Sequence, residues 1–410
     1  MRKALFGIVT VLMVLCAGGW YRPKDFGEFP KPCSPESWVR HGIVIEPNQP
    51  WEGSSIQNFN SPPEALGDGR WRIWYGFWGS TATYGSGMNI AVAEGVPGGK
   101  WTKHVAVLTE GEPADAPLAI GNLPNGWRPV QPVHIKLKNG RDRLYFWAHG
   151  PKDRVVRYLA AESDDGKRYK VLDPHRPCMW HFHDRAVEFA GTTPAGLKLA
   201  GKSEELRKRF PRPEGEPAAD PELTSNDGAT IYQLEDGTFE MYVNSLVSLG
   251  KGDPRWAEKD NLAGYVRVID RLISKDGLKF YGRQTVIKRD PVRDAIDQQF
   301  YYLNVTYTPK GRVGMLGHYR LKDQTMDLEW CYSKDGVNWV RPFRNRPWLE
   351  RGWPGEGDAY AVYTGTSVVY DQGKWWLFYT GCNYTHNMKQ HYGEPRSVIM
   401  LATTESIWNK

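Results

Sequence analysis

The sequence lacks the features that mark several common protein classes. Its lysines and arginines form no block longer than a few residues, and the formal net charge is only +6 over 410 residues. Nucleic-acid-binding surfaces concentrate basic side chains, so the sequence predicts no nucleic-acid partner. The 5 cysteines include no Cys-x-x-Cys pair, which argues against a structural zinc site, and their spacing does not reveal which of them could pair as disulfides. Apolar runs of helical period are almost absent, so we expect a fold made of β-strands.

Long apolar segments are also rare, and the clearest one lies at the N-terminus. Residues 4–15 are mainly apolar, follow a basic start and precede small residues at 17–19. This pattern is typical of a secretory signal, and the run is short for a membrane span. We therefore expect residues 1–19 to be a signal peptide and the protein to be exported to the periplasm or the cell exterior. Cys16 is a candidate lipid-attachment residue, and such an anchor is the one membrane contact that we consider.

Aromatic residues, in contrast, are abundant, and they recur in a repeated pattern. The chain has 18 Trp and 21 Tyr, which suit β-sheet cores and pockets that stack on sugar rings. An aromatic strand after a Gly-containing turn recurs at residues 70–77, 142–148, 237–243, 311–318 and 373–380. A β-rich segment, expected to be the innermost strand of its copy, precedes each one at residues 56–66, 130–137, 229–234, 300–308 and 361–370. These signals predict five copies of one unit.

A second repeated signal follows the third strand of each copy. The turns at 163–166, 274–277 and 333–336 share the pattern Ser-x-Asp-Gly with an aromatic residue three positions later, and weaker versions occur at 93–101 and 402–408. Asp-Gly supplies the positive φ that a tight hairpin turn needs. The two signals alternate in register along the chain, which supports the count of five.

This repetition predicts an all-β fold, a five-bladed β-propeller that forms a single domain over residues 20–410. The last copy ends soon after its third strand, so something must cover that open edge. Residues 38–45 are the natural candidate, and we expect this N-terminal strand to close the ring. An insertion at about 193–222, rich in Pro, Gly, Lys and Glu, lengthens the third copy.

Three carboxylates precede or begin the inner strands of the last three copies, where ligands of a propeller bind. They are Asp227, Asp297 and Asp358. Carboxylates grouped in one pocket raise one another's pKa, so one can donate a proton while another accepts one or attacks. Glycoside cleavage requires that pair of roles. Each of the three has an alternative role, because Asp227 and Asp297 can shape turns and Asp358 can be a flexible surface acid.

Further polar and aromatic residues near the expected axis are candidates for substrate binding. They are Asn58, Asn60, Glu64, Trp78, Gln131, His134, His181, His183, Asn226, Gln298, Tyr301, His318, Tyr363 and His386. Packing is the alternative role for Trp78 and Tyr301, and a structural salt bridge is the alternative for Glu64. The pair His181 and His183 lacks a third ligand at fixed spacing, so we expect neither a metal nor a cofactor.

The blade pattern, and above all the Ser-Lys-Asp-Gly-x-x-aromatic turn, resembles the five-bladed glycoside hydrolases related to families 32 and 43. The stretches 297–301, 328–339, 363–367 and 379–383 carry this resemblance. It implies a glycoside hydrolase with a carbohydrate substrate. Family 32 places its nucleophile in an Asn-Asp-Pro segment, whereas Asn60-Ser61-Pro62 stands here, so the acids of the last three copies must carry any catalysis.

Two alternatives to hydrolysis remain open. A propeller whose first blade lacks the acid can be a non-catalytic carbohydrate-binding protein, and Ser61 favours that interpretation. Related propellers also include glycoside phosphorylases, in which one carboxylic acid suffices and basic residues hold phosphate; Arg128, Arg320 and His318 are the candidates for that role.

Overall fold

The computed structural model describes residues 29–58, 60–81, 85–150, 154–174, 178–179, 223–249, 252–363 and 367–409. The regular structure of these residues is β-strand apart from one 3-10 turn, η1 (Pro35–Ser37). The expectation of an all-β fold is therefore confirmed. The predicted signal peptide with Cys16 and the insertion at 193–222 lie outside the described residues.

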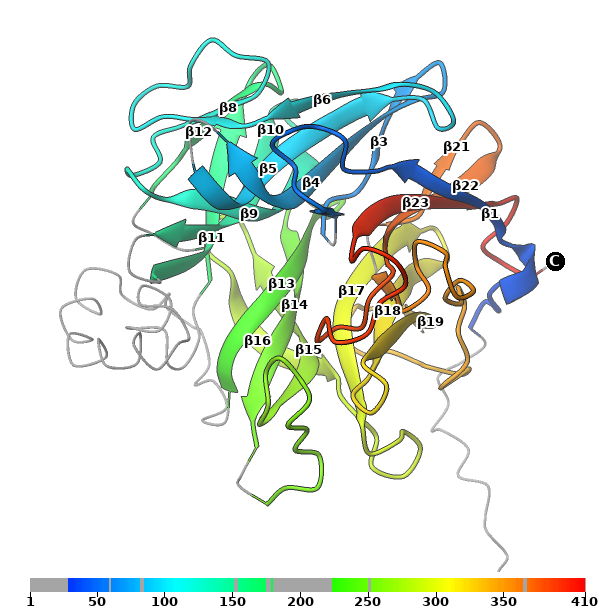
Figure 1. The fold of residues 1–410 in the computed structure, drawn as a ribbon. Helices are drawn as coiled ribbons and strands as arrows, with labels where there is room; N and C mark the ends of the chain where they lie inside the picture. Colours follow the sequence, from blue (N-terminus) through cyan, green and yellow to red (C-terminus); the bar gives the residue numbers. More distant parts are fainter. Residues whose placement is uncertain are drawn as a thin grey trace, which may run out of the picture.

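The strands fall into five successive units in chain order, which follow the colour bar of Figure 1 from blue to red. Hydrogen bonds link units four, five and one into one 13-stranded sheet, whereas units two and three form separate sheets. Unit one contains β2 (Ser55–Gln57), β3 (Glu64–Gly67), β4 (Arg70–Thr81), β5 (Gly85–Gly95) and β6 (Trp101–Val105). Unit two contains β7 (Val107–Leu108), β8 (Ala119–Gly121), β9 (Arg128–Lys136), β10 (Asp142–Gly150), β11 (Arg154–Ser163) and β12 (Arg168–Val171). Unit three contains β13 (Leu223–Gln233), β14 (Phe239–Ser248), β15 (Tyr265–Ser274) and β16 (Tyr281–Ile287).

The last two units complete the sequence of strands. Unit four contains β17 (Gln298–Thr308), β18 (Gly311–Arg320) and β19 (Thr325–Ser333). Unit five contains β20 (Ala361–Tyr363), β21 (Val369–Asp371), β22 (Lys374–Cys382) and β23 (Ser397–Thr404). Within each unit the successive long strands pair antiparallel, so all five predicted aromatic strands are confirmed as β4, β10, β14, β18 and β22.

Hydrophobic clusters join each unit to the next. Trp74 of unit one packs with Phe146 of unit two, and similar clusters join units two and three, three and four, and four and five. A further cluster joins Trp71 of unit one to Phe378 of unit five. The apolar sides of the strands are therefore buried between neighbouring sheets, in a cycle of contacts that runs from the first unit to the fifth and back.

The N-terminal strand covers the outer edge of the last unit. Strand β1 (Val39–Ile45) pairs antiparallel with β23, from Val39 opposite Thr403 to Ile45 opposite Ile399, and Figure 1 shows the two strands side by side. The ring of Trp38 packs edge-on against Trp348, with centroids 5.1 Å apart. This pairing is the one that the sequence predicted for residues 38–45, and it removes an exposed strand edge.

Two of the predicted inner strands are broken, contrary to expectation. The segment 56–66 forms the end of β2 and the start of β3, and the segment 361–370 forms β20 and part of β21. In unit one the reason is chemical, because Pro62 and Pro63 have no N–H to donate to a neighbouring strand. Each half still pairs with the second strand of its unit.

The Ser-x-Asp-Gly turns form as predicted and also connect neighbouring units. In one of them Asp276 accepts the N–H of Leu278 (2.7 Å), and Gly277 has φ +72°. The Tyr145 hydroxyl of unit two donates to the Gly277 carbonyl of unit three (2.9 Å). The Tyr242 hydroxyl of unit three makes the same contact with the Gly336 carbonyl of unit four (3.2 Å).

Candidate functional site

The inner strands of the five units are interrupted partway along their length. Strands β9, β13 and β17 each contain a β-bulge, at Gln131, between Asn226 and Ala229, and at Tyr302. Gln131 and Tyr302 adopt positive φ values of 52° and 50°, which are rare for residues other than glycine. In units one and five the inner strand breaks instead. Bulges and strained residues concentrate at functional sites, because they redirect side chains.

Residues from four units converge on the bulge of unit three. The Asn60 side chain of unit one donates to the Ala229 carbonyl (2.6 Å), and the Ala229 N–H donates to the Tyr158 hydroxyl of unit two (2.6 Å). A Cβ atom on Gly228 would lie 2.2 Å from the ring of Tyr302 in unit four and 2.9 Å from Asn60 Nδ2. Only glycine fits there, so the backbone of the adjoining Asp227 lies where these units meet.

Four of the predicted site residues have side chains that the structure does not cover. The side chains of Asn226 and Asp227 lie outside the described residues, although their backbone belongs to β13. His181 and His183 lie outside the described residues altogether. Their roles stay predictions.

Residues of unit one between β2 and β3 form a compact, buried turn. The Asn58 side chain accepts the N–H groups of Asn60 (3.2 Å) and Ser61 (3.1 Å) and donates to the Ser61 carbonyl (3.1 Å). The Ser61 hydroxyl accepts the N–H of His134 (3.0 Å), and the Asn58 N–H donates to Thr380 of unit five (2.9 Å). This turn ties units two and five to unit one and holds Asn60 toward the bulge.

A second polar and aromatic group, here called the tyrosine–histidine cluster, joins units three, four and five. It consists of Asp260, Arg267, Tyr301, Tyr319 and His386. The Tyr301 hydroxyl lies 2.9 Å from His386 Nε2, and the Tyr319 hydroxyl lies 3.2 Å from His386 Nδ1. The Tyr319 hydroxyl also donates to Asp260 (2.6 Å). Two predicted residues, Tyr301 and His386, are thus brought together next to the bulge at Tyr302.

The charges of this cluster are buried and paired. Arg267 is fully buried and donates to Asp260 (2.8 Å) and to Gln299 (2.8 Å). Its guanidinium lies 4.6 Å from the ring centroid of Tyr301, at cation–π distance. Burial acts to raise the pKa of Asp260, but the hydrogen bond from His386 and the charge of Arg267 hold it below the usual range. Asp260 therefore stays ionised.

Sequence reasoning missed Asp260 and Arg267. Arg267 occupies a position in β15 where neighbouring residues are buried, and a charged residue in such a strand signals a buried ion pair. Asp260 lies in a loop and gave no signal. Tyr363, which was predicted, lies near the cluster, with its ring centroid 6.5 Å from that of His386.

The other two predicted catalytic carboxylates each have their own cation. Asp297 pairs with Arg320 (2.7 Å) and accepts the Lys322 N–H (3.1 Å), and although burial opposes them these bonds lower the pKa of Asp297. Asp358 is fully buried and bonds to Arg40 and to the Tyr379 hydroxyl (3.0 Å), while burial raises the pKa of Asp358 above its usual value. Arg320 belongs to β18 and Arg40 to β1. A different arginine, from a different strand, therefore holds each carboxylate.

The buried His134 and the partly exposed Glu64 form a network between units one and two. His134 bonds to Glu64 through Nδ1 and to Asp142 through Nε2 (3.0 Å), and its ring stacks on Trp74 at 5.1 Å. Burial acts to lower the pKa of His134, but the charges and hydrogen bonds of the two carboxylates outweigh it and raise that pKa. This arrangement joins the two units.

The remaining predicted residues take varied positions. The Trp78 side chain is 51% exposed, whereas Gln298 is buried and donates to the Gln299 carbonyl (2.7 Å). His318 is nearly buried and lies 3.1 Å from Asn345 Oδ1 within unit four. Their substrate-binding roles stay predictions.

Within the part of the chain that the structure describes, no group of three or more His, Cys, Asp or Glu side chains is placed to hold a metal ion. Four cysteines, Cys33, Cys178, Cys331 and Cys382, are buried as free thiols. No helix among the described residues is long and apolar enough to cross a membrane.

Comparison with known proteins reveals similarity of fold. No family model matches the chain, and no curated protein matches it. A solved BT0996–RGII complex is 14% identical, with a TM-score of 0.53, over 93% of this chain and 94% of the other. A solved glycoside hydrolase is also 14% identical, with a TM-score of 0.52 and the same coverage. The shared arrangement of strands therefore extends over nearly the whole chain.

Proposed function

We propose that this chain is an exported glycoside hydrolase whose five units are the blades of a β-propeller closed by β1. The cycle of hydrophobic clusters, which joins unit five back to unit one, supports the ring. The pairing of β1 with β23 supports its closure. The likeness in fold to a glycoside hydrolase, at 14% identity, favours a carbohydrate as the substrate.

The convergence of four units on the Asp227–Gly228 bulge carries the proposal. At this point a side chain from unit one, a hydroxyl from unit two and a ring from unit four surround the backbone of unit three. The backbone that carries Asp227 thus lies where four of the five units meet, and a sugar bound across a propeller axis would contact several units at such a point. We assign the carboxylate that faces the anomeric carbon to Asp227, which acts as the nucleophile or as the base for water.

The tyrosine–histidine cluster is proposed to bind the sugar next to this carboxylate. Tyr301 and His386 bond to each other in the unbound protein (2.9 Å), so we propose that a sugar hydroxyl exchanges with this hydrogen bond when it binds, while Asp260 and Arg267 fix the orientation of the cluster. The ion pairs of Asp297 and Asp358 suit them to hold the loops that lead into β17 and β20. We propose that one of these two carboxyl groups donates a proton to the leaving oxygen as the glycosidic bond breaks, and that the other helps to position the site.

One observation favours a second candidate function. Ser61 stands where family 32 has its nucleophile, and its hydroxyl is occupied by the N–H of His134. A propeller with that change can bind glycans without cleaving them. For a phosphorylase the support is weaker, because Arg320 is paired with Asp297 and His318 is bonded to Asn345.

The test is glycan release by the purified mature chain, with and without phosphate. A broad panel of oligosaccharides and polysaccharides is incubated with wild type, Asp227→Asn and Asp297→Asn, and new reducing ends are measured. We expect release without phosphate, and a loss of about 10²–10⁴-fold in Asp227→Asn at unchanged melting temperature. In Asp297→Asn we expect a lower melting temperature, because Arg320 loses its partner.

Three results would contradict the proposal. Equal activity of Asp227→Asn and wild type would show that Asp227 is not the catalytic carboxylate. Release that requires phosphate would identify a phosphorylase. Binding to glycans without release of any sugar would favour the non-catalytic propeller.

A further inference from the structure

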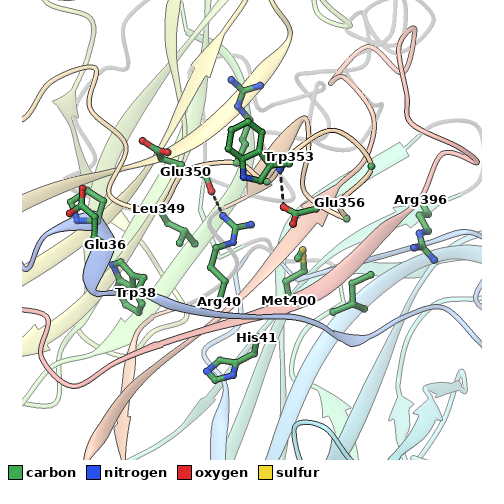
Figure 2. A pocket seen from close by; sticks show the side chains of 17 residues that line it. Glu36, Trp38, Arg40, His41, Leu349, Glu350, Trp353, Glu356, Arg396 and Met400 are labelled. Carbon is green, nitrogen blue, oxygen red and sulfur yellow. Dashed lines mark hydrogen bonds between the residues drawn. The ribbon is translucent and has the colours of Figure 1, made fainter.

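A groove runs along the flank of unit five, between β1 and the loop 349–357 (Figure 2). Its volume is about 770 Å³, within the range of small-molecule sites. Residues 40–43 of β1 form one wall, the loop forms the other, and Arg396 and Met400 complete the floor. We call this the flank groove. It is built from the outermost strands of unit five, so it is separate from the convergence at Gly228.

An exposed tryptophan stands over the flank groove. The Trp353 side chain is 80% exposed, and Figure 2 shows it between Glu350 and Glu356. The backbone N–H of Trp353 donates to the Glu356 carboxylate (2.8 Å), and the backbone N–H of Glu356 donates to the Trp353 carbonyl (2.9 Å). The turn that carries the ring is therefore fixed. A large, flat ring on a fixed turn is a stacking surface that loses little entropy when a ligand binds.

The same wall depends on a glycine. A Cβ atom on Gly352 would lie 2.2 Å from Asp358 Oδ1 and 2.3 Å from Glu356 Oε2. Behind this wall the fully buried Asp358 binds Arg40, which also donates to the Glu350 carbonyl. The guanidinium in the groove is thus held in place before any ligand arrives.

The charges that line the groove are balanced. Three glutamates and three arginines line it, namely Glu36, Glu350, Glu356, Arg40, Arg351 and Arg396. A balanced lining gives no net attraction for a polyanion or a polycation. Carboxylates accept hydrogen bonds and guanidiniums donate them, whereas a sugar hydroxyl does both. An uncharged ligand with many hydroxyl groups matches this lining best, and its apolar face matches the ring of Trp353.

We propose that the flank groove is a second glycan-binding site, which holds a segment of a neutral polysaccharide on Trp353. This inference rests on the proposed function, because it takes the substrate to be a glycan. The site holds the polymer at the side of the molecule and leaves bond cleavage to the convergence at Asp227.

Native affinity electrophoresis of the full mature chain tests the proposal. The gels contain a neutral glucan, mannan, galactan, arabinan or xylan, and the proteins are wild type, Trp353→Ala and Tyr370→Ala. Tyr370 is the matched control, since it is 59% exposed on β21, away from the groove. We expect at least one polymer to retard the wild type, and Trp353→Ala to weaken that binding roughly fivefold or more. Tyr370→Ala should bind as wild type does, and both variants should cleave a short oligosaccharide at the wild-type rate.

The possible failures are distinguishable. If Trp353→Ala and wild type are retarded equally, the flank groove is not the glycan-binding site, and the proposed function is unaffected. The same conclusion follows if the wild type cleaves glycans but no polymer retards it. A change in sedimentation of Trp353→Ala without a change in retardation overturns the groove and identifies a contact between protein copies instead. A wild type that neither cleaves nor binds any glycan overturns the proposed function together with the groove.

Discussion

At the scale of single residues, buried charges join the units and limit which polar residues can serve the substrate. The network of His134, Glu64 and Asp142 is one example, because each charged group has its partner inside the protein. Removing one partner of such a bond leaves the other unsatisfied, which costs more than the bond itself contributes. We therefore expect substitutions in this network to lower the stability of the fold more than they lower the activity.

The stability that Glu64 provides should depend on pH. Because the pKa of His134 in the folded protein lies above its ordinary value of 6.5, the protonated ring stabilises the fold fully below about pH 6.5 and this contribution is lost as the pH rises through the folded pKa. Glu64→Gln should therefore lower the free energy of unfolding by about 2 kcal/mol at pH 6 and by less at pH 9. Urea denaturation at the two pH values measures the difference.

A matched control separates this effect from the loss of the bond to Arg72. Glu94 also bonds to Arg72 (2.8 Å), so Glu94→Gln removes that kind of contact without touching His134. Its cost should be below about 1 kcal/mol and should not change between the two pH values. If Glu64→Gln behaves in the same way as Glu94→Gln, His134 is not protonated in the folded protein.

His134 also illustrates why side-chain direction was hard to predict from the sequence. Along a regular strand, alternate residues face alternate sides. The bulge at Gln131 adds a residue to β9, so the alternation shifts before it reaches His134. The sequence correctly predicted that His134 lies in the inner strand of its unit, but no pattern in it indicated the bulge at Gln131.

At the scale of elements, the Ser-x-Asp-Gly turn is the clearest case in which local chemistry decides the structure. Its side-chain bonds and positive φ lie within a few residues, so the sequence predicted the turn at 274–277 correctly. This turn also contacts Tyr145 of the preceding unit, and Tyr145 and Gly277 are 132 residues apart in the chain. No local pattern encodes that contact.

Two glycine variants test whether the turn joins the units. Gly277→Ala places a Cβ atom 2.6 Å from the Tyr145 hydroxyl and 2.9 Å from the ring of Phe239, at φ +72°. Strain and overpacking together should cost about 2–4 kcal/mol. Gly237 has φ +88° with nothing within 4 Å of such an atom, so Gly237→Ala should cost only about 1–2 kcal/mol.

Chemical denaturation of both variants measures the difference. If the two substitutions cost the same free energy, the backbone strain alone explains them and the contact between units contributes nothing. A larger cost for Gly277→Ala identifies the contact with unit two as part of the stability of the fold.

At the scale of the whole molecule, the cycle of clusters between units explains how distant residues come to share one place. Asn60, Tyr158, Gly228 and Tyr302 belong to four units and meet at one bulge. The repeat pattern predicted the units and the pairing of residues 38–45 with the last one. It did not place Asp260 and Arg267 beside Tyr301 and His386, because these contacts arise only when units three, four and five assemble.

A crystal structure of the protein soaked with the monosaccharide that it releases tests the assignment of Asp227 most directly. We predict a sugar ring at the Asp227–Gly228 bulge, with the Asp227 carboxylate within about 3.2 Å of the anomeric carbon or its oxygen and with Tyr301 or His386 bonded to a hydroxyl. A bulge that stays empty, with the Asp227 carboxylate paired to a cation of the protein, would contradict the assignment of Asp227 as the catalytic carboxylate.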